Sequence, residues 1–386
     1  MKSYANNIKT IKTDNRAMIL NIIRKSPISR ADISKRTGLS KSSVTMITNA
    51  LISEGRLIEI GTDESLKGRK PILLDIVSDY RFAAGVILHR KEIRTCLTDL
   101  KCEVLASNSC PISNFKCAEE ILDYAAKSLK ALIKKCGFNA DKCIGVGISS
   151  PGPLDRENGI ILSPPSLEIL HNTQVVKGVS ERLNINNVVL ENNAVLLAMR
   201  ENVLQNEENM RNFMSVIVSN GIGSAIVTDG EIYRGAGGFS GELGHISVVT
   251  NGMPCDCGNK GCLEKYASLD AVKKKFSFPH YHALVDNAYE GDEFSLSVLQ
   301  YIANYLGSGL VTAINLFDLD AVILHGDYSY RPKIINYMLK KYIDENSFVA
   351  KAHNVSVIDT SDRREKEDGN STAAVIEQYF NQAMEE

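Results

Sequence analysis

Hydrophobic positions along the first eighty residues predict a small helical module that ends in a β-hairpin. Ile19, Leu20, Ile22 and Ile23 fall on one face of a helix predicted over residues 16–24. Ser29 can cap a short helix over residues 30–37 that turns Ile33 inward, and Gly38 can then form a tight turn. This order of elements is typical of a helix-turn-helix.

The next helix carries the residues expected to read DNA. Ser40 can cap it, and Val44, Ile47 and Leu51 recur at the spacing of one buried face. Several small polar side chains then point outward, namely Lys41, Ser42, Ser43, Thr45, Thr48 and Asn49. Of these we expect Lys41, Ser42, Ser43 and Thr45 to contact the major groove, because short donors approach base edges and phosphates closely.

Two short apolar runs follow and predict a wing. A strand over residues 57–60 leads through a polar turn to a second strand over residues 72–76, and Arg69 and Lys70 lie near the tip of this hairpin. We expect Arg69 and Lys70 to contact the DNA backbone or minor groove. A winged helix that contacts another protein is the alternative interpretation.

Charge separates this module from the rest of the chain. Residues 1–75 contain fourteen Lys and Arg against seven Asp and Glu, a net charge of +7, whereas the whole chain carries −2. The remainder therefore carries −9. A basic module on an acidic body favours a polyanionic partner for the module alone.

Beyond residue 80 the chain alternates apolar strands, as predicted over residues 82–88, 144–149 and 321–324, with amphipathic helices, as predicted over residues 118–135. This alternation predicts an α/β body with two lobes. Its 386 residues suffice for two or three domains. No apolar run has the length of a membrane span, and the polar N-terminus does not resemble a signal peptide. Nine cysteines spread over a long chain do not form a disulfide framework, so we expect a reducing, cytoplasmic location.

One cluster of cysteines has the spacing of a metal site. Residues 255–262 read Cys-Asp-Cys-Gly-Asn-Lys-Gly-Cys, and His245 lies ten residues upstream. Thiolates and imidazole are the preferred ligands of structural zinc, and His245, Cys255, Cys257 and Cys262 would make a tetrahedral set. Gly258 and Gly261 let the intervening loop bend sharply. The alternative is a surface loop with ordinary reduced cysteines.

Nearly the whole chain resembles the repressor branch of the ROK family (repressors, open reading frames and kinases), which includes xylose repressors. The resemblance rests on GRKPILLDI, GISSPGPLDRENGII, LENNAVLLA, VSNGIGSAIVTDGEIYRGAGGFSGELGH, CDCGNKGCLE and GLVTAINLFDLDAVILHG. The cysteine motif is highly specific to the family. The resemblance implies a winged helix-turn-helix over residues 1–78 and an actin-like, ribonuclease-H-like body over residues 79–386, in which a sugar binds between two lobes.

Three departures from the kinases of this family argue against catalysis. His89 stands where a glycine lets a loop approach phosphate, and His325-Gly326 stands where kinases tend to have a glycine pair. Asn193 replaces the Asp that accepts the proton of the sugar hydroxyl, and a neutral amide cannot act as that general base. We therefore expect no enzymatic activity.

The sugar-binding side of the family is retained. Asn192, Glu242, His245 and Glu264 match the sugar-contacting positions, and Asn193 can still donate and accept hydrogen bonds. As an alternative, Glu242 and Glu264 only cap or solvate the metal loop.

These observations predict a sugar-responsive transcriptional repressor of carbohydrate-utilisation genes. It would bind zinc, operator DNA and a sugar or sugar derivative, and act as a homodimer or homotetramer. Two other interpretations stay open: an active sugar kinase with an added DNA-binding head, and a regulator controlled by a protein partner such as a sugar-transport component.

Overall fold

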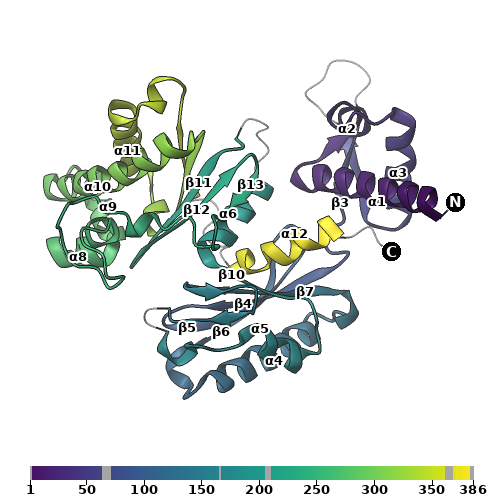
Figure 1. Cartoon of the computed structure of the whole chain (residues 1–386), viewed down its shortest axis with the longest axis horizontal. Coiled ribbons are helices and arrows are strands. Elements are labelled where there is room, and N and C mark those ends of the chain that lie inside the picture. The colour runs from purple at the N-terminus through teal and green to yellow at the C-terminus, as the bar shows by residue number, and fades with distance from the viewer. Residues whose placement is uncertain (1, 63–70, 165–166, 205–209, 361–367, 383–386) are drawn as a thin grey trace. The chain divides into compact units, whose positions relative to one another are not determined.

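The computed structural model describes residues 2–62, 71–164, 167–204, 210–360 and 368–382. The chain divides into two compact units (Figure 1). Residues 1–196, 203–206 and 368–386 form the first unit, and residues 197–202 and 207–367 form the second. The chain therefore leaves the first unit, builds the second, and returns.

The N-terminal head of the first unit has the predicted helices and hairpin. It consists of α1 (Lys2–Lys25), β1 (Ile28–Ser29), α2 (Arg30–Thr37), α3 (Lys41–Ser53), β2 (Leu57–Thr62) and β3 (Ile72–Ile76). The strands form a sheet in the order β1-β3-β2. Helix α1 begins well before the predicted start near residue 16.

Both predicted helix caps of the head are confirmed. The Ser29 hydroxyl accepts a hydrogen bond from the Asp32 amide at 3.2 Å, and the Ser40 hydroxyl accepts one from the Ser43 amide at 3.1 Å. Gly38 ends α2 with a φ of 71°, a conformation that costs most other residues energy. The two caps fix where α2 and α3 begin, and so fix the angle at which α3 leaves the turn.

The body of the first unit is a five-stranded sheet in the order β10-β7-β4-β5-β6. Helices α4 and α5 cover one face of this sheet and α12 lies on the other (Figure 1). The elements are β4 (Phe82–Leu88), β5 (Glu92–Thr98), β6 (Val104–Pro111), α4 (Ala118–Lys135), β7 (Cys143–Ser150), β8 (Leu154–Asp155), β9 (Ile160–Ile161), α5 (Val175–Leu183), β10 (Val188–Asn192), α6 (Asn193–Leu204) and α12 (Ala373–Gln382). Short 3₁₀ turns cover Ile112–Asn114, Ala140–Lys142 and Glu168–Leu170.

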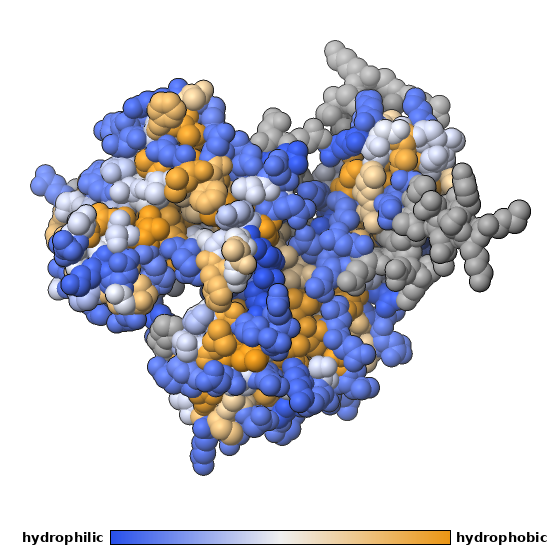
Figure 2. All heavy atoms as spheres, in the orientation of Figure 1, coloured by the Kyte–Doolittle hydropathy of each residue, from blue (hydrophilic) through white to orange (hydrophobic). Residues whose placement is uncertain are grey.

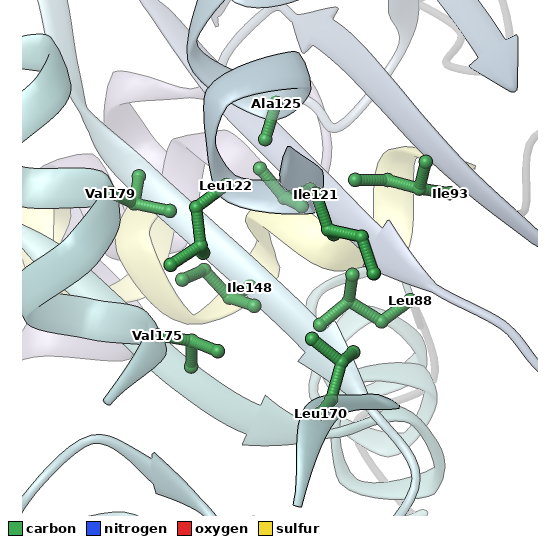
Figure 3. Close-up of a pocket in the computed structure, with 10 residues that line it drawn as sticks. Leu88, Ile93, Ile121, Leu122, Ala125, Ile148, Leu170, Val175 and Val179 are labelled. Atoms are coloured by element: carbon green, nitrogen blue, oxygen red, sulfur yellow. The ribbon is translucent and has the colours of Figure 1, made fainter. Parts of the chain in front are cut away.

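The core of this body lies between the sheet and its two covering helices. Figure 3 shows a small pocket there that is lined wholly by apolar side chains from β4, β5, β7, α4, α5 and the turn before α5. They are Val86, Leu88, Ile93, Ile121, Leu122, Ala125, Ile148, Leu170, Val175 and Val179. With no polar group to orient a ligand, this pocket is a packing feature of the core.

The second unit repeats the topology of the first. Its sheet has the order β13-β12-β11-β14-β15, so in each unit three antiparallel strands are followed by two parallel ones. Its elements are β11 (Phe213–Val218), β12 (Ile222–Thr228), β13 (Glu231–Tyr233), α7 (Glu264–Ala267), α8 (Leu269–Phe276), α9 (Tyr281–Tyr289), α10 (Glu293–Phe317), β14 (Ala321–Gly326), α11 (Lys333–Asn346) and β15 (Ser356–Asp359). Short 3₁₀ turns cover Leu243–His245, Asp327–Ser329 and Val349–Lys351.

Helix α12 connects the body of the first unit to its head. The Asn21 side-chain amide donates to Asn381 Oδ1 at 3.3 Å, and the Arg24 guanidinium lies 4.9 Å from the centre of the Phe380 ring. Burial lowers the pKa of Arg24, and the carboxylate of Glu377 opposes this effect. The last helix of the chain therefore packs on the first.

Hydrophilic side chains cover most of the face shown in Figure 2, and hydrophobic side chains gather there in separate patches. Among the described helices, none is long and apolar enough to span a membrane.

Candidate functional site

The structure brings the predicted metal ligands together in the second unit. The side chains of His245, Cys255, Cys257 and Cys262 place one ligand atom each within 4.8 Å of the others. Cys255 Sγ lies 3.7 Å from His245 Nδ1, and Cys257 Sγ lies 3.7 Å from Cys262 Sγ. Three sulfurs and one imidazole nitrogen at this spacing could hold a metal ion.

Backbone hydrogen bonds connect the segments that carry the cluster. The Val248 amide donates to the Gly261 carbonyl and the Leu263 amide to the Ile246 carbonyl, both at 2.9 Å, which ties the segment after His245 to the segment around Cys262. The Cys255 amide donates to the Asn259 carbonyl at 2.9 Å and closes the loop. The ligands therefore come from two segments that are fixed by backbone hydrogen bonds.

The thiols of the cluster differ in acidity. Burial raises the pKa of Cys255 to about 12 and also raises the pKa of Cys262. A hydrogen bond from the backbone near Asn259 lowers the pKa of the exposed Cys257. Cys257 is thus the thiol that this environment ionises most readily.

Two carboxylates flank the cluster. Glu264 begins α7, and its Oε1 accepts from Cys255 Sγ at 3.2 Å and lies 3.8 Å from His245 Nδ1. Glu242 precedes the turn that carries His245 and has an exposed side chain. Desolvation by the surrounding chain raises the pKa of Glu242, and the nearby His245 opposes this shift. The metal cluster and both carboxylates therefore lie on one short stretch of surface.

In the first unit, Asn192 ends β10 and Asn193 begins α6, so both asparagines lie at this junction of strand and helix. The Ala194 amide lies 2.8 Å from Asn192 Oδ1 and 2.9 Å from Asn193 Oδ1. The Asn192 oxygen therefore caps α6, and this arrangement leaves the side-chain N–H groups of both asparagines to serve as donors. These asparagines and the carboxylates of the second unit belong to different units, so the predicted sugar-binding set remains a prediction.

The DNA-reading helix is mostly as predicted, with one error. Lys41, Ser42 and Thr45 are exposed on α3, and Ser43 is half-buried with its hydroxyl 2.8 Å from that of Ser40. The prediction that Thr48 points outward is wrong. Its side chain is buried because its hydroxyl accepts from Arg30 Nε at 3.0 Å.

The outer face of α3 also carries an apolar side chain that was not predicted there. Met46 is 62% exposed on this face. The predicted contacts of Arg69 and Lys70 lie outside the described residues.

The loop where kinases hold phosphate is a turn after β4. The His89 amide donates to the Glu92 carbonyl at 3.0 Å and closes this turn. Burial lowers the pKa of His89, and the neighbouring Arg94 lowers it further. His325, at the end of β14, is buried. Both histidines are therefore packed parts of the fold.

Comparison with known proteins identifies the family. The family model described as "ROK family" matches residues 83–375, and a model described as "Winged helix-turn-helix DNA-binding" matches residues 13–58. The chain belongs to the ROK family. The predictions of the family and of the fold class are thereby confirmed.

Relatives that match most of this ROK protein are named as transcriptional regulators. It is 32% identical to the xylose repressor of Bacillus subtilis (strain 168), over 85% of each chain. It is 28% identical to the DNA-binding transcriptional dual regulator NagC of Escherichia coli (strain K12), over 91% of this chain and 90% of NagC.

Solved structures agree on the fold. A ROK family transcriptional regulator described as a homolog of the E. coli MLC protein matches with a TM-score of 0.77 and 23% identity, over 97% of this chain and 98% of the other. A ROK hexokinase from Thermus thermophilus matches with a TM-score of 0.64 and 25% identity, over 76% of this chain and 97% of the hexokinase.

The two glycines of the cysteine loop give a matched test of how the cluster is built. Gly258 and Gly261 have φ values of 91° and 76°, but a Cβ on Gly261 would lie 1.8 Å from the Val249 carbonyl oxygen, whereas one on Gly258 meets open space. We expect Gly258→Ala to lower the free energy of unfolding by about 1–2 kcal/mol through strain. Gly261→Ala should cost roughly 2–5 kcal/mol, since overpacking adds to that strain. Chemical denaturation of both variants measures the difference, and equal losses would contradict the proposed packing of Gly261.

Proposed function

We propose that this protein is a transcriptional repressor that controls carbohydrate-utilisation genes in response to a sugar. The observation that carries the proposal is the joining of a winged helix-turn-helix to a ROK body in a chain that matches a named xylose repressor over 85% of each chain. The proposed boundary places the head in residues 1–78 and the sugar-binding body in residues 79–386. Xylose and N-acetylglucosamine, which the relatives' names contain, are the first sugars to test.

Loss of kinase chemistry supports regulation over catalysis. At the position that matches the kinase base, Asn193 is a neutral amide whose oxygen already lies against the Ala194 amide. It can hold a sugar hydroxyl by donating a hydrogen bond, but it cannot remove a proton from that hydroxyl. A sugar bound there would be held without being phosphorylated.

The side chains proposed to contact the sugar offer complementary donors and acceptors. Asn192 and Asn193 offer N–H donors, whereas Glu242 and Glu264 offer acceptors, and His245 can do either through its free ring nitrogen. Sugar hydroxyls both donate and accept. Only a sugar that binds two states of the regulator with unequal affinity can change that state.

We also propose that the cluster holds Zn²⁺ through His245, Cys255, Cys257 and Cys262. The donor set supports zinc, because three thiolates and one imidazole make a complete tetrahedral structural site. The ion would fix the loop that precedes Glu264 and so orient one sugar-contacting carboxylate. The protein is further proposed to bind a pseudo-palindromic operator as a homodimer or homotetramer, since paired heads match paired half-sites.

The metal proposal predicts about one zinc per chain in freshly purified protein. Cys257→Ser should lower the zinc content and the Tm, because removing one thiolate opens the tetrahedral set. Cys117→Ser is the matched control, because Cys117 is an exposed cysteine of the first unit. Elemental analysis and thermal unfolding measure both quantities. Protein free of zinc, with a Tm unchanged by strong chelation, would contradict the proposal.

The sugar proposal predicts that Glu242→Ala loses the response to sugar while operator binding remains. A charged hydrogen bond contributes about 1.5–3 kcal/mol, so sugar affinity should fall roughly ten- to a hundredfold. Glu231→Ala, which removes an exposed carboxylate on β13 of the same unit, should change neither property. Calorimetry with the sugar and a gel-shift assay test the two effects. If no sugar binds the unmodified protein, control by a protein partner is favoured instead.

The DNA proposal predicts that neutralising Arg69 and Lys70 together weakens binding to every DNA sequence. Loss of two phosphate contacts should flatten the slope of log affinity against log salt by about 2. Neutralising Lys273 and Lys274, two exposed cations of the second unit, is the control with the same change in charge. Operator titrations at several salt concentrations give the slopes. An unchanged slope in the Arg69 and Lys70 variant would remove the wing from the DNA interface.

A further inference from the structure

One guanidinium joins three elements of the head. Arg30, the first residue of α2, donates from Nε to Thr48 Oγ1 at 3.0 Å and from Nη2 to Asn49 Oδ1 at 3.1 Å, both on α3. Its Nη1 lies 2.8 Å from Glu59 Oε1 on β2. Each nitrogen of this side chain therefore has a partner inside the protein.

The contact with Asn49 determines which way that side-chain amide faces. A guanidinium carries only N–H donors, so the atom of Asn49 that faces Arg30 must be the oxygen. The NH₂ group of Asn49 is then turned away from Arg30. Asn49 is exposed, so this group can donate to a molecule outside the head.

Asn49 stands on the outer face of the DNA-reading helix. Ser42, Thr45, Met46 and Asn49 are exposed at spacings of three and four residues along α3, which places them on one helical face. The Thr45 hydroxyl donates to the Lys41 carbonyl at 2.8 Å, and the Ser42 hydroxyl lies 2.9 Å from that of Ser40. Asn49 thus presents a donor whose orientation a neighbouring cation enforces.

We propose that Arg30 is a positioning residue that makes Asn49 read a hydrogen-bond acceptor on a base edge in the major groove. This inference rests on the proposed DNA-binding function. An asparagine with both ends free pairs with adenine through two hydrogen bonds, using its oxygen and its NH₂ group. With its oxygen held by Arg30, Asn49 selects the position of an acceptor, such as N7 or O6 of guanine. Three of the five N–H donors of Arg30 are directed at Thr48, Asn49 and Glu59 inside the head.

The test is selection of bound duplexes from a random DNA library by the full-length protein and two variants. In Asn49→Asp the carboxylate still accepts from Arg30 but has no donor, so the head keeps its contacts and loses the outward N–H group. We expect the preference at one base position per half-site to fall about five- to tenfold, or to turn toward cytosine, whose N4 group donates. In Arg30→Gln the Asn49 amide is released, and we expect the same position to relax or to turn toward adenine.

Lys35→Gln is the matched control, because Lys35 is a cation of α2 with a 78% exposed side chain that pairs with Asp32. It should leave the selected sequence unchanged. Combining Arg30→Gln with Asn49→Asp should add little at that position, since both changes act on one contact.

The outcomes distinguish a failure of this inference from a failure of the proposed DNA-binding function. A library in which the unmodified protein enriches no sequence would remove the DNA-binding proposal and the inference together. Enrichment by the unmodified protein, with the same preferences retained by Asn49→Asp, would overturn the inference alone. A changed preference at different positions in the two variants would also overturn it, because Arg30 would then act without Asn49.

Discussion

The return of the chain into the first unit depends on a backbone contact that only glycine permits. The segment before α12 lies so close to β4 and β7 that a Cβ on Gly85 would be 2.1 Å from Ser371 Oγ, and one on Gly147 would be 1.9 Å from the Ser371 carbonyl oxygen. The buried hydroxyls of Thr98 and Thr372 lie 2.8 Å apart beside this contact. This contact anchors the segment that leads into α12. Helix α12 then reaches α1 of the head through Asn381 and Phe380.

A close backbone contact at a glycine also builds the cluster of His245, Cys255, Cys257 and Cys262. Gly261 lets the loop approach the Val249 carbonyl, and backbone hydrogen bonds then place Cys262 beside the segment that follows His245. In both places glycine contributes no side-chain packing, and close contact between backbone atoms stabilises the structure instead. In the second unit a bound metal ion would add to this stability.

Sequence patterns predicted the helices and strands that are determined by residues close together in the sequence. The caps at Ser29 and Ser40, the helix over Ala118–Lys135 and the buried strands β4, β7 and β14 follow from spacing and capping chemistry, and the structure agrees. The prediction for Thr48 is wrong because a distant cation, Arg30, decides the burial of that side chain. Strand β6 was not predicted, because most of its residues are not buried and show no alternation. The proximity of His245, Cys255, Cys257 and Cys262 was predictable from residue type and spacing. The contact between Arg30 and Asn49 depends on tertiary structure.

Capping chemistry also explains how a sugar-binding body can lose catalysis and keep recognition. An aspartate at the position of Asn193 would offer two carboxylate oxygens, of which one could cap α6 and the other could accept a proton. Asn193 has a single oxygen, and the Ala194 amide lies against it. The fold at the start of α6 is thus preserved. The side chain that would act as a base if it were an aspartate is instead, as Asn193, a hydrogen-bond donor. A sugar bound there would contribute only binding free energy. A regulator can use that free energy to favour one of its states, because no chemical step consumes the ligand.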